Sequence, residues 1–230
     1  MRVMVAIVAV ALAASAACGG NGGGNSEGTS AKATIDAKAQ ERAESIMLKL
    51  SDFPHGWQAI PAGKEDPGGE KFRRCIGVDD SALTILGNAT SANFAMGEAT
   101  EASSNARVLK DDTQAKDAVE TLSHGMASAR DCVQTLLPPL GKNFKLGKVE
   151  VGKLRINPSG VDEARAWQIA IPVRVIAGPQ KGDLATGYLN VVYLRKADML
   201  VRMKTANTPS PFDSELRDKL LQALATRMTE

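Results

Sequence analysis

The sequence lacks the residues and motifs on which most catalytic and metal sites depend. It has two histidines, three cysteines and 4% aromatic residues among 230. His55 lies in a Pro-Gly turn and His124 precedes a glycine, and neither has a ligand partner at metal-site spacing. G-x-S-x-G, P-loop and G-x-G-x-x-G motifs are all missing. We therefore expect no catalytic residue, metal site or cofactor, and interpret the chain as a protein that is not an enzyme.

An excess of one charge and a long apolar run are also missing. Lysine and arginine together number 28 against 26 aspartates and glutamates, and the two signs are interspersed. Such a balance leaves no basic surface for nucleic acid, which excludes nucleic-acid binding. The apolar run 3–14 is too short to span a bilayer, which needs about 20 apolar residues.

The N-terminus has the three-part order of a secretory signal peptide. Arg2 is followed by the apolar run and then by the small residues 15–17, which precede Cys18. Ser15-Ala16-Ala17-Cys18 resembles the lipobox of bacterial lipoproteins, which implies that Cys18 is diacylated and becomes the first mature residue. Lipoboxes most often carry leucine where this chain has Ser15. Ala14-Ser15-Ala16 also fits ordinary cleavage, so a secreted protein stays open as the alternative.

These features predict a division of the chain into three parts. Residues 1–17 are a lipoprotein signal peptide, residues 18–33 are the lipidated Cys18 with a flexible linker, and residues 34–230 are a single extracytoplasmic domain. Two acyl chains anchor a protein stably, and the Gly/Asn/Ser linker would hold the domain roughly 20 Å from the bilayer. The predicted location is the extracytoplasmic face of the cell membrane, with the membrane as one partner.

Cys75 and Cys132 remain once Cys18 is assigned to lipid attachment. An even pair in an oxidising compartment predicts a disulfide bond. Closing a loop of this length would stabilise the fold by about 4 kcal/mol in the chain-entropy model. Two buried free thiols are the alternative.

Hydrophobic periodicity predicts an α+β fold. The stretches "ARAWQIAIPVRVIAG", "LATGYLNVVYLR" and "MLVRMKTA" alternate like strands of an antiparallel meander, whereas "PAGKEDPGGEKFRR" is typical of a loop. Helical patterns begin at Thr34, after Asp111 as N-cap and after Ser210 as N-cap. Strands with one apolar face need a covering layer, so we predict an antiparallel β-sheet with helices packed on one face.

Several spaced motifs carry a resemblance to a family. They are "LSDFPHGW" after the first helix, Cys75 followed by Ile76-Gly77, Cys132 in a long helix, and "LVRMKTA" followed by "PFDSELRDKLLQALATRM". Together they resemble actinobacterial, mycobacterial-type sensor-domain-like extracytoplasmic lipoproteins, which are related in appearance to the external domain of mycobacterial membrane serine/threonine kinases. The resemblance implies an α+β domain with disulfides. This chain has one candidate disulfide and no kinase segment.

Three functions fit these observations. The first is a non-catalytic binding or sensor-like domain on a membrane anchor, with an unknown envelope ligand or protein as partner. The second is a carrier of a lipid or other apolar ligand, which needs a large internal cavity. The third is a hydrolase with a dispersed carboxylate site. Trp57 is a candidate ligand contact, Trp167 is expected in the core, and the pairs Asp79-Asp80 and Asp111-Asp112 are interpreted as helix caps.

Overall fold

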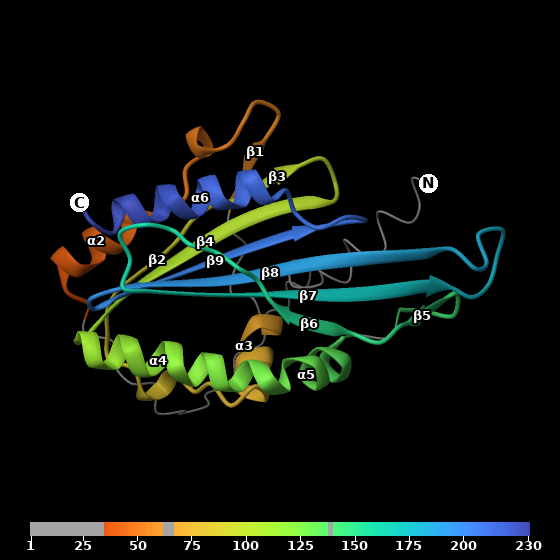
Figure 1. Ribbon diagram of the computed structural model, residues 1–230, viewed down its shortest axis with the longest axis horizontal. Helices are drawn as coiled ribbons and strands as arrows, with labels where there is room; N and C mark the ends of the chain where they lie inside the picture. Colours follow the sequence, from red (N-terminus) through yellow and green to blue (C-terminus); the bar gives the residue numbers. More distant parts are fainter. Residues whose placement is uncertain (1–34, 62–66, 138–139) are drawn as a thin grey trace, which may run out of the picture.

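A single antiparallel sheet forms the centre of the molecule, and helices lie on both sides of it (Figure 1). The computed structural model describes residues 35–61, 67–137 and 140–230. The predicted signal peptide, Cys18 and the linker lie outside the described residues. The predicted α+β class and the antiparallel sheet are confirmed.

The sheet has the order β1-β3-β4-β9-β8-β7-β5, in which β2 also pairs with β4 and β6 also pairs with β7. Its strands are β1 (Gln58–Ile60), β2 (Ile85–Thr90), β3 (Asn93–Met96), β4 (Thr100–Leu109), β5 (Phe144–Leu146), β6 (Glu150–Lys153), β7 (Glu163–Val175), β8 (Leu184–Lys196) and β9 (Met199–Asn207). The predicted meander is confirmed as β7, β8 and β9. Trp167 and the four apolar residues that alternate with it along β7 are buried, as the period of two requires.

Two helices cover one side of the sheet, called here the upper face. These are α2 (Ala37–Ile46) and α6 (Ser214–Arg227), which lie above the strands in Figure 1. Ala39, Ala43 and Ile46 form the buried stripe of α2, as the helical spacing predicts. Helix α6 begins after Asp213, whose carboxylate accepts from the Leu216 amide at 2.7 Å. The prediction of Ser210 as its N-cap is therefore wrong, and the acidic residue three positions later takes that role.

Three helices cover the opposite side, the lower face. They are α3 (Pro67–Cys75), α4 (Asp112–Gly125) and α5 (Ala129–Leu136), and a short 3-10 turn, Met126–Ser128, joins the last two. Asp111 caps α4 as predicted, because its carboxylate accepts from the Gln114 amide at 2.8 Å. The segment "PAGKEDPGGEKFRR" was predicted to be a loop because of its glycines and prolines. That prediction is wrong for its second half, which forms α3.

The prediction that helices pack on one face is wrong. Four consecutive residues of β8, Val191–Leu194, are all buried. Val192 and Leu194 belong to the core between the sheet and the upper helices α2 and α6. Val191 and Tyr193 belong to the core between the sheet and the lower helices α4 and α5. A stretch of a central strand that is apolar at consecutive positions needs cover on both sides of the sheet. The lower helices supply the second cover.

Candidate functional site

A pocket of about 550 Å³ opens on the lower face. It lies between α4, the 3-10 turn Asp80–Ala82 and the central strands β4, β9 and β8. Its volume falls within the range of small-molecule sites, about 300 to 1,000 Å³. Apolar atoms make up the larger share of its lining surface, but most of the residues that contribute to it are polar or charged. The lining residues are Arg73, Val78, Asp79, Asp80, Ala82, Leu83, Asn105, Arg107, Asp111, Thr113, Gln114, Asp117, Ala118, Thr121, Leu122, Tyr193, Leu200 and Arg202.

Strand register builds the floor of this pocket. Arg202 on β9 is paired with Asn105 on β4 on one side and with Tyr193 on β8 on the other. Arg107, two residues after Asn105 on β4, is paired with Leu200 on β9, and this pair lies on the same side of the sheet. Side chains two apart on a strand share a face, so these five residues all face the lower helices. The Asn105 amide group donates to the Ala89 carbonyl at 2.8 Å, which fixes its orientation.

Asp80 is the common partner of two arginines. Its Oδ2 lies 2.9 Å from Nη2 of Arg107 and 3.2 Å from Nε of Arg73. The three side chains are between 20% and 26% exposed, so water screens these pairs only in part. Nε of Arg107 is buried and, among the described residues, has no hydrogen-bond partner. One carboxylate thus serves two guanidinium groups and leaves a donor free.

Arg202 is a second cation with unused donors. In the described part of the chain, no carboxylate lies within ion-pair distance of it. It is only half-buried, so it keeps contact with the open side of the pocket. Buried and half-buried arginines in folded proteins are ordinarily paired. Arg202 therefore presents its five N–H donors to whatever occupies the pocket.

The carboxylates of the walls have structural partners of their own. Asp79 accepts from the Ser81 amide at 2.8 Å, and Asp111 caps α4, so both are caps as predicted. Hydrogen bonds from the Ser81 side chain and amide hold the pKa of Asp79 below its usual range. Asp117, on the second turn of α4, is exposed and accepts no hydrogen bond from the residues described. Among the described residues, it is the one wall carboxylate with no hydrogen-bond or ion-pair partner.

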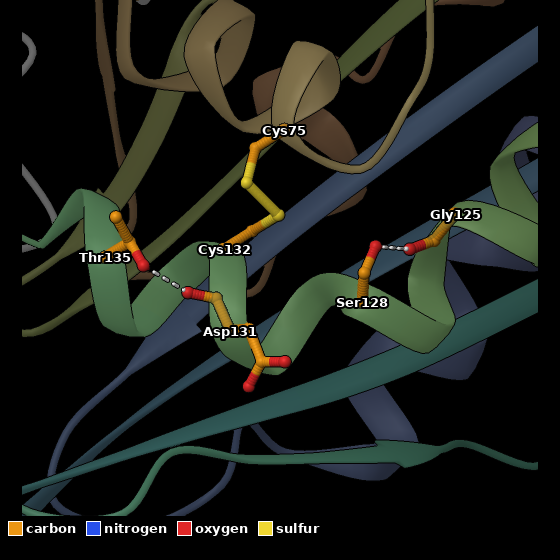
Figure 2. Close-up of a disulfide and its surroundings, with 6 residues drawn as sticks. All are labelled: Cys75, Gly125, Ser128, Asp131, Cys132 and Thr135. Atoms are coloured by element: carbon orange, nitrogen blue, oxygen red, sulfur yellow. Dashed lines mark hydrogen bonds between the residues drawn. A yellow bond between two sulfur atoms is a disulfide. The ribbon is translucent and has the colours of Figure 1, made fainter.

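The disulfide fixes one wall of the pocket. Cys75 ends α3 and is bonded to Cys132 of α5, with their Cα atoms 5.7 Å apart (Figure 2). The predicted disulfide is confirmed, and the alternative of two free thiols is wrong. Arg73 lies two residues before Cys75, so the bond holds the element that brings Arg73 to Asp80. On α5, the Thr135 hydroxyl donates to the backbone carbonyl of Asp131, one helical turn earlier in the chain, at 2.8 Å.

Trp57 lies away from this pocket. It is 6% exposed in the upper core, where its ring is 4.6 Å from Phe53 and 6.0 Å from Phe212 between centroids. The structure thus brings this candidate ligand contact into an aromatic core cluster. Trp167 is a core residue of the lower face, as expected.

The histidines and the described helices add no second site. His55 and His124 are both exposed. Within residues 35–61, 67–137 and 140–230, no group of three or more potential ligands could hold a metal ion. Across the same ranges, no helix is both long enough and apolar enough to cross a bilayer.

The sequence predictions did not include the pocket arginines. Arg73, Arg107 and Arg202 come from three elements far apart in the chain, and no short motif links them. One signal was available for two of them. Arg107 and Arg202 interrupt the strand patterns of "ASSNARVLK" and "LVRMKTA" at positions that face a core, and charged residues at such positions are rare unless they are paired or functional.

Comparisons with known proteins leave the site to be interpreted from its chemistry. No protein-family model matches the chain, and no curated protein matches it either.

Proposed function

We propose that this protein is a non-catalytic binding or sensor-like module, anchored through Cys18 to the extracytoplasmic face of the cell membrane. The pocket between α4 and the sheet is its ligand site. One observation carries the proposal: the floor of a ligand-sized pocket holds Arg202 with no hydrogen-bond or ion-pair partner among the described residues. Hydrogen bonds to a charged group contribute about 1.5–3 kcal/mol. A bound molecule that accepts from the Arg202 guanidinium supplies such bonds, which favours occupancy.

The two arginines of the floor argue against a carrier of apolar ligands. An alkyl chain placed over Arg107 and Arg202 would remove water from both guanidinium groups without replacing their hydrogen bonds. Apolar carriers instead line their cavities with aliphatic and aromatic side chains. A polar ligand is the better match to this floor.

The carboxylates argue against a hydrolase. A general acid needs a pKa raised toward neutrality, whereas the pKa of Asp79 is lowered. Asp80 is held by two arginines and Asp111 by the Gln114 amide, so neither is placed to exchange protons with a substrate. Because these three carboxylates have structural partners, they support a module that binds its ligand without transforming it.

The disulfide supports the proposed location. Disulfides persist in secreted and envelope proteins and are rare in the cytosol. The Cys75–Cys132 bond is therefore consistent with export by the signal-like segment 1–17 and with the lipobox at Cys18. Intact mass of the protein from native membranes tests the anchor. We expect a chain that starts at Cys18 with acyl chains, and a Cys18→Ala variant without them; an unacylated wild-type chain would contradict the anchor.

A matched pair of variants tests the ligand site. Thr121 lines the pocket and is exposed, so Thr121→Trp fills the pocket without disturbing the core. Glu120→Trp places the same ring on the preceding position of α4, which is also exposed but lies outside the lining. Each protein is incubated with a small-molecule extract of the cell envelope, and retained compounds are identified by native mass spectrometry.

We expect the wild type and Glu120→Trp to retain the same compound and Thr121→Trp to lose it. The compound should leave the protein with an unchanged mass, because the module does not transform it. Retention by all three proteins, or by none, would contradict the assignment of the pocket. A product of altered mass would favour the hydrolase alternative.

A further inference from the structure

We infer that the ligand of this pocket carries a carboxylate or phosphate group, and that this group binds between Arg202 and Arg107. The inference rests on the proposed function, because it assigns the chemistry of the ligand at that same pocket. It depends on three observations about the floor: the strand register, the distribution of partners and the position of the remaining carboxylate.

The register places the two arginines within reach of one anion. Arg107 lies opposite Leu200, and Arg202 is two residues further along β9, so the two arginines are diagonal neighbours across β4 and β9. Diagonal positions on neighbouring antiparallel strands are about 7–8 Å apart at the backbone, within reach of long side chains. Both guanidinium groups can therefore donate to the oxygens of one carboxylate or phosphate, which are the groups that arginine donors match best.

The partners of the floor leave positive charge uncompensated at this point. Asp80 is the only carboxylate that the described residues place on Arg107, and Arg73 shares it. Arg202 has none there. Two like charges at diagonal positions repel one another in a partly dry pocket. An anion between them removes the repulsion and accepts hydrogen bonds from the unused donors of Arg202.

The wall formed by α4, opposite the floor, determines which functional groups the rest of the ligand carries. Thr113, Asp117 and Thr121 lie along the side of α4 that lines the pocket, at spacings of four. Their hydroxyl and carboxylate oxygens accept hydrogen bonds, so they favour hydroxyl or amino groups on the ligand. The expected ligand is a small polar molecule with an anionic group at one end and hydrogen-bond donors at the other, such as a phosphorylated or acidic sugar.

Three probes separate these chemistries. Glucose 6-phosphate carries both parts, glucose carries only the hydroxyl groups, and glucosamine carries an ammonium group in place of one hydroxyl group and has no anionic group. Each is titrated into the isotope-labelled full chain, and binding is followed by calorimetry and by shifts of backbone amide signals. Inorganic phosphate is titrated as the smallest anionic probe.

We expect glucose 6-phosphate to bind saturably and to shift the amides of Arg107, Tyr193 and Arg202 most. Glucose should bind more weakly, and phosphate should shift the same floor amides. Loss of a charge-assisted hydrogen bond costs about 1.5–3 kcal/mol, so Arg202→Gln should weaken binding of glucose 6-phosphate about tenfold to a hundredfold. Arg202→Lys should weaken it less, because the charge remains while the paired donors are lost.

Arg155→Gln is the matched control, since Arg155 is exposed and lies outside the pocket lining. It should bind as the wild type does. Unfolding curves of all variants establish that each is folded. Two results would overturn the inference: floor amides that respond to glucosamine but not to either phosphate probe, or phosphate binding that Arg202→Gln leaves unchanged. A neutral or cationic compound retained by the wild type and lost in Thr121→Trp would overturn the inference alone, whereas no retained compound contradicts the proposed function.

Discussion

The two faces of the sheet are built in different ways. On the upper face, α6 buries Leu220, Leu221 and Leu224, each at most 1% exposed, in a continuous apolar core with α2. On the lower face, a disulfide joins α3 to α5, and the pocket separates part of α4 from the strands. The upper face thus provides packing and the lower face provides a site. Charged groups with unused donors lower the stability of the fold, and the apolar packing of the upper core compensates for that loss.

The disulfide joins the two shortest α-helices of the described residues. Helices α3 and α5 have 9 and 8 residues, whereas α2 has 10 and α4 and α6 have 14 each. Helices shorter than about 12–15 residues are marginal by themselves and depend on tertiary contacts. Arg73, which serves the pocket, extends from the shorter pair. The disulfide supplies the constraint that a larger apolar interface supplies on the upper face.

The largest expected effect is the loss of this bond. The Cys75→Ala/Cys132→Ala variant releases a loop with a sequence separation of 57, and the free energy of unfolding should fall by about 4 kcal/mol. Hydrogen exchange should accelerate in α3 and α5 before it changes in α2 and α6. Urea denaturation and exchange mass spectrometry measure the two effects. If α2 and α6 lose protection first, the division of roles between the faces is wrong.

The next effect belongs to the upper face. Leu224→Ala removes a fully buried side chain from α6, and the cavity should lower the free energy of unfolding by about 3 kcal/mol. Binding at the pocket should keep its affinity, because Leu224 belongs to the core on the other side of the sheet. Leu184→Ala, at an exposed leucine of the β7–β8 end, is the control and should change stability little. A parallel loss of ligand affinity in Leu224→Ala would show that the faces are coupled.

Close backbone contacts are expected to be equally important on both faces. A Cβ on Gly87 would overlap with the Ala39 carbonyl oxygen of α2, and one on Gly125 would overlap with the Ile76 carbonyl oxygen. Each Gly→Ala variant should therefore lose about 2 kcal/mol through overpacking. Gly152→Ala, where a Cβ meets no atom within 4 Å, is the control. Unfolding midpoints compare the three, and a small loss at Gly125 alone would mean that the lower helices can shift.

The sequence allowed prediction of those features that short segments encode. The alternation along β7, the Asp111 cap and the cysteine pair are local or arithmetic signals, and all are confirmed. The second helical layer was missed because the run Val191–Leu194 of β8, which is buried at four consecutive positions, has no period that shows which faces are covered. The pocket was missed because Arg107 and Arg202 meet only after β4 pairs with β9, and nothing local encodes that pairing.

The smallest expected effect concerns an ion pair that ties α6 to the chain before β1. Asp52 lies 2.6 Å and 2.9 Å from the two terminal nitrogens of Arg227. Burial would raise the pKa of Asp52, but hydrogen bonds from Arg227 and from the Lys49 amide, with the charge of Arg227, outweigh it and lower the pKa. A lowered folded pKa means that the stabilisation is complete above the unfolded pKa of about 4 and is lost as the pH falls below it.

Asp52→Asn should therefore lower the free energy of unfolding by about 1 kcal/mol at neutral pH, and the difference from the wild type should shrink as the pH falls below about 4. Urea denaturation at a series of pH values measures it. Asp79→Asn is the counterpart on the lower face, where Ser81 lowers the pKa of an exposed carboxylate, so its dependence on pH should have the same sign and a smaller size. A difference at Asp52 that persists unchanged in acid would assign its role to packing, because Arg227 also donates to the Met47 carbonyl and keeps that contact at every pH.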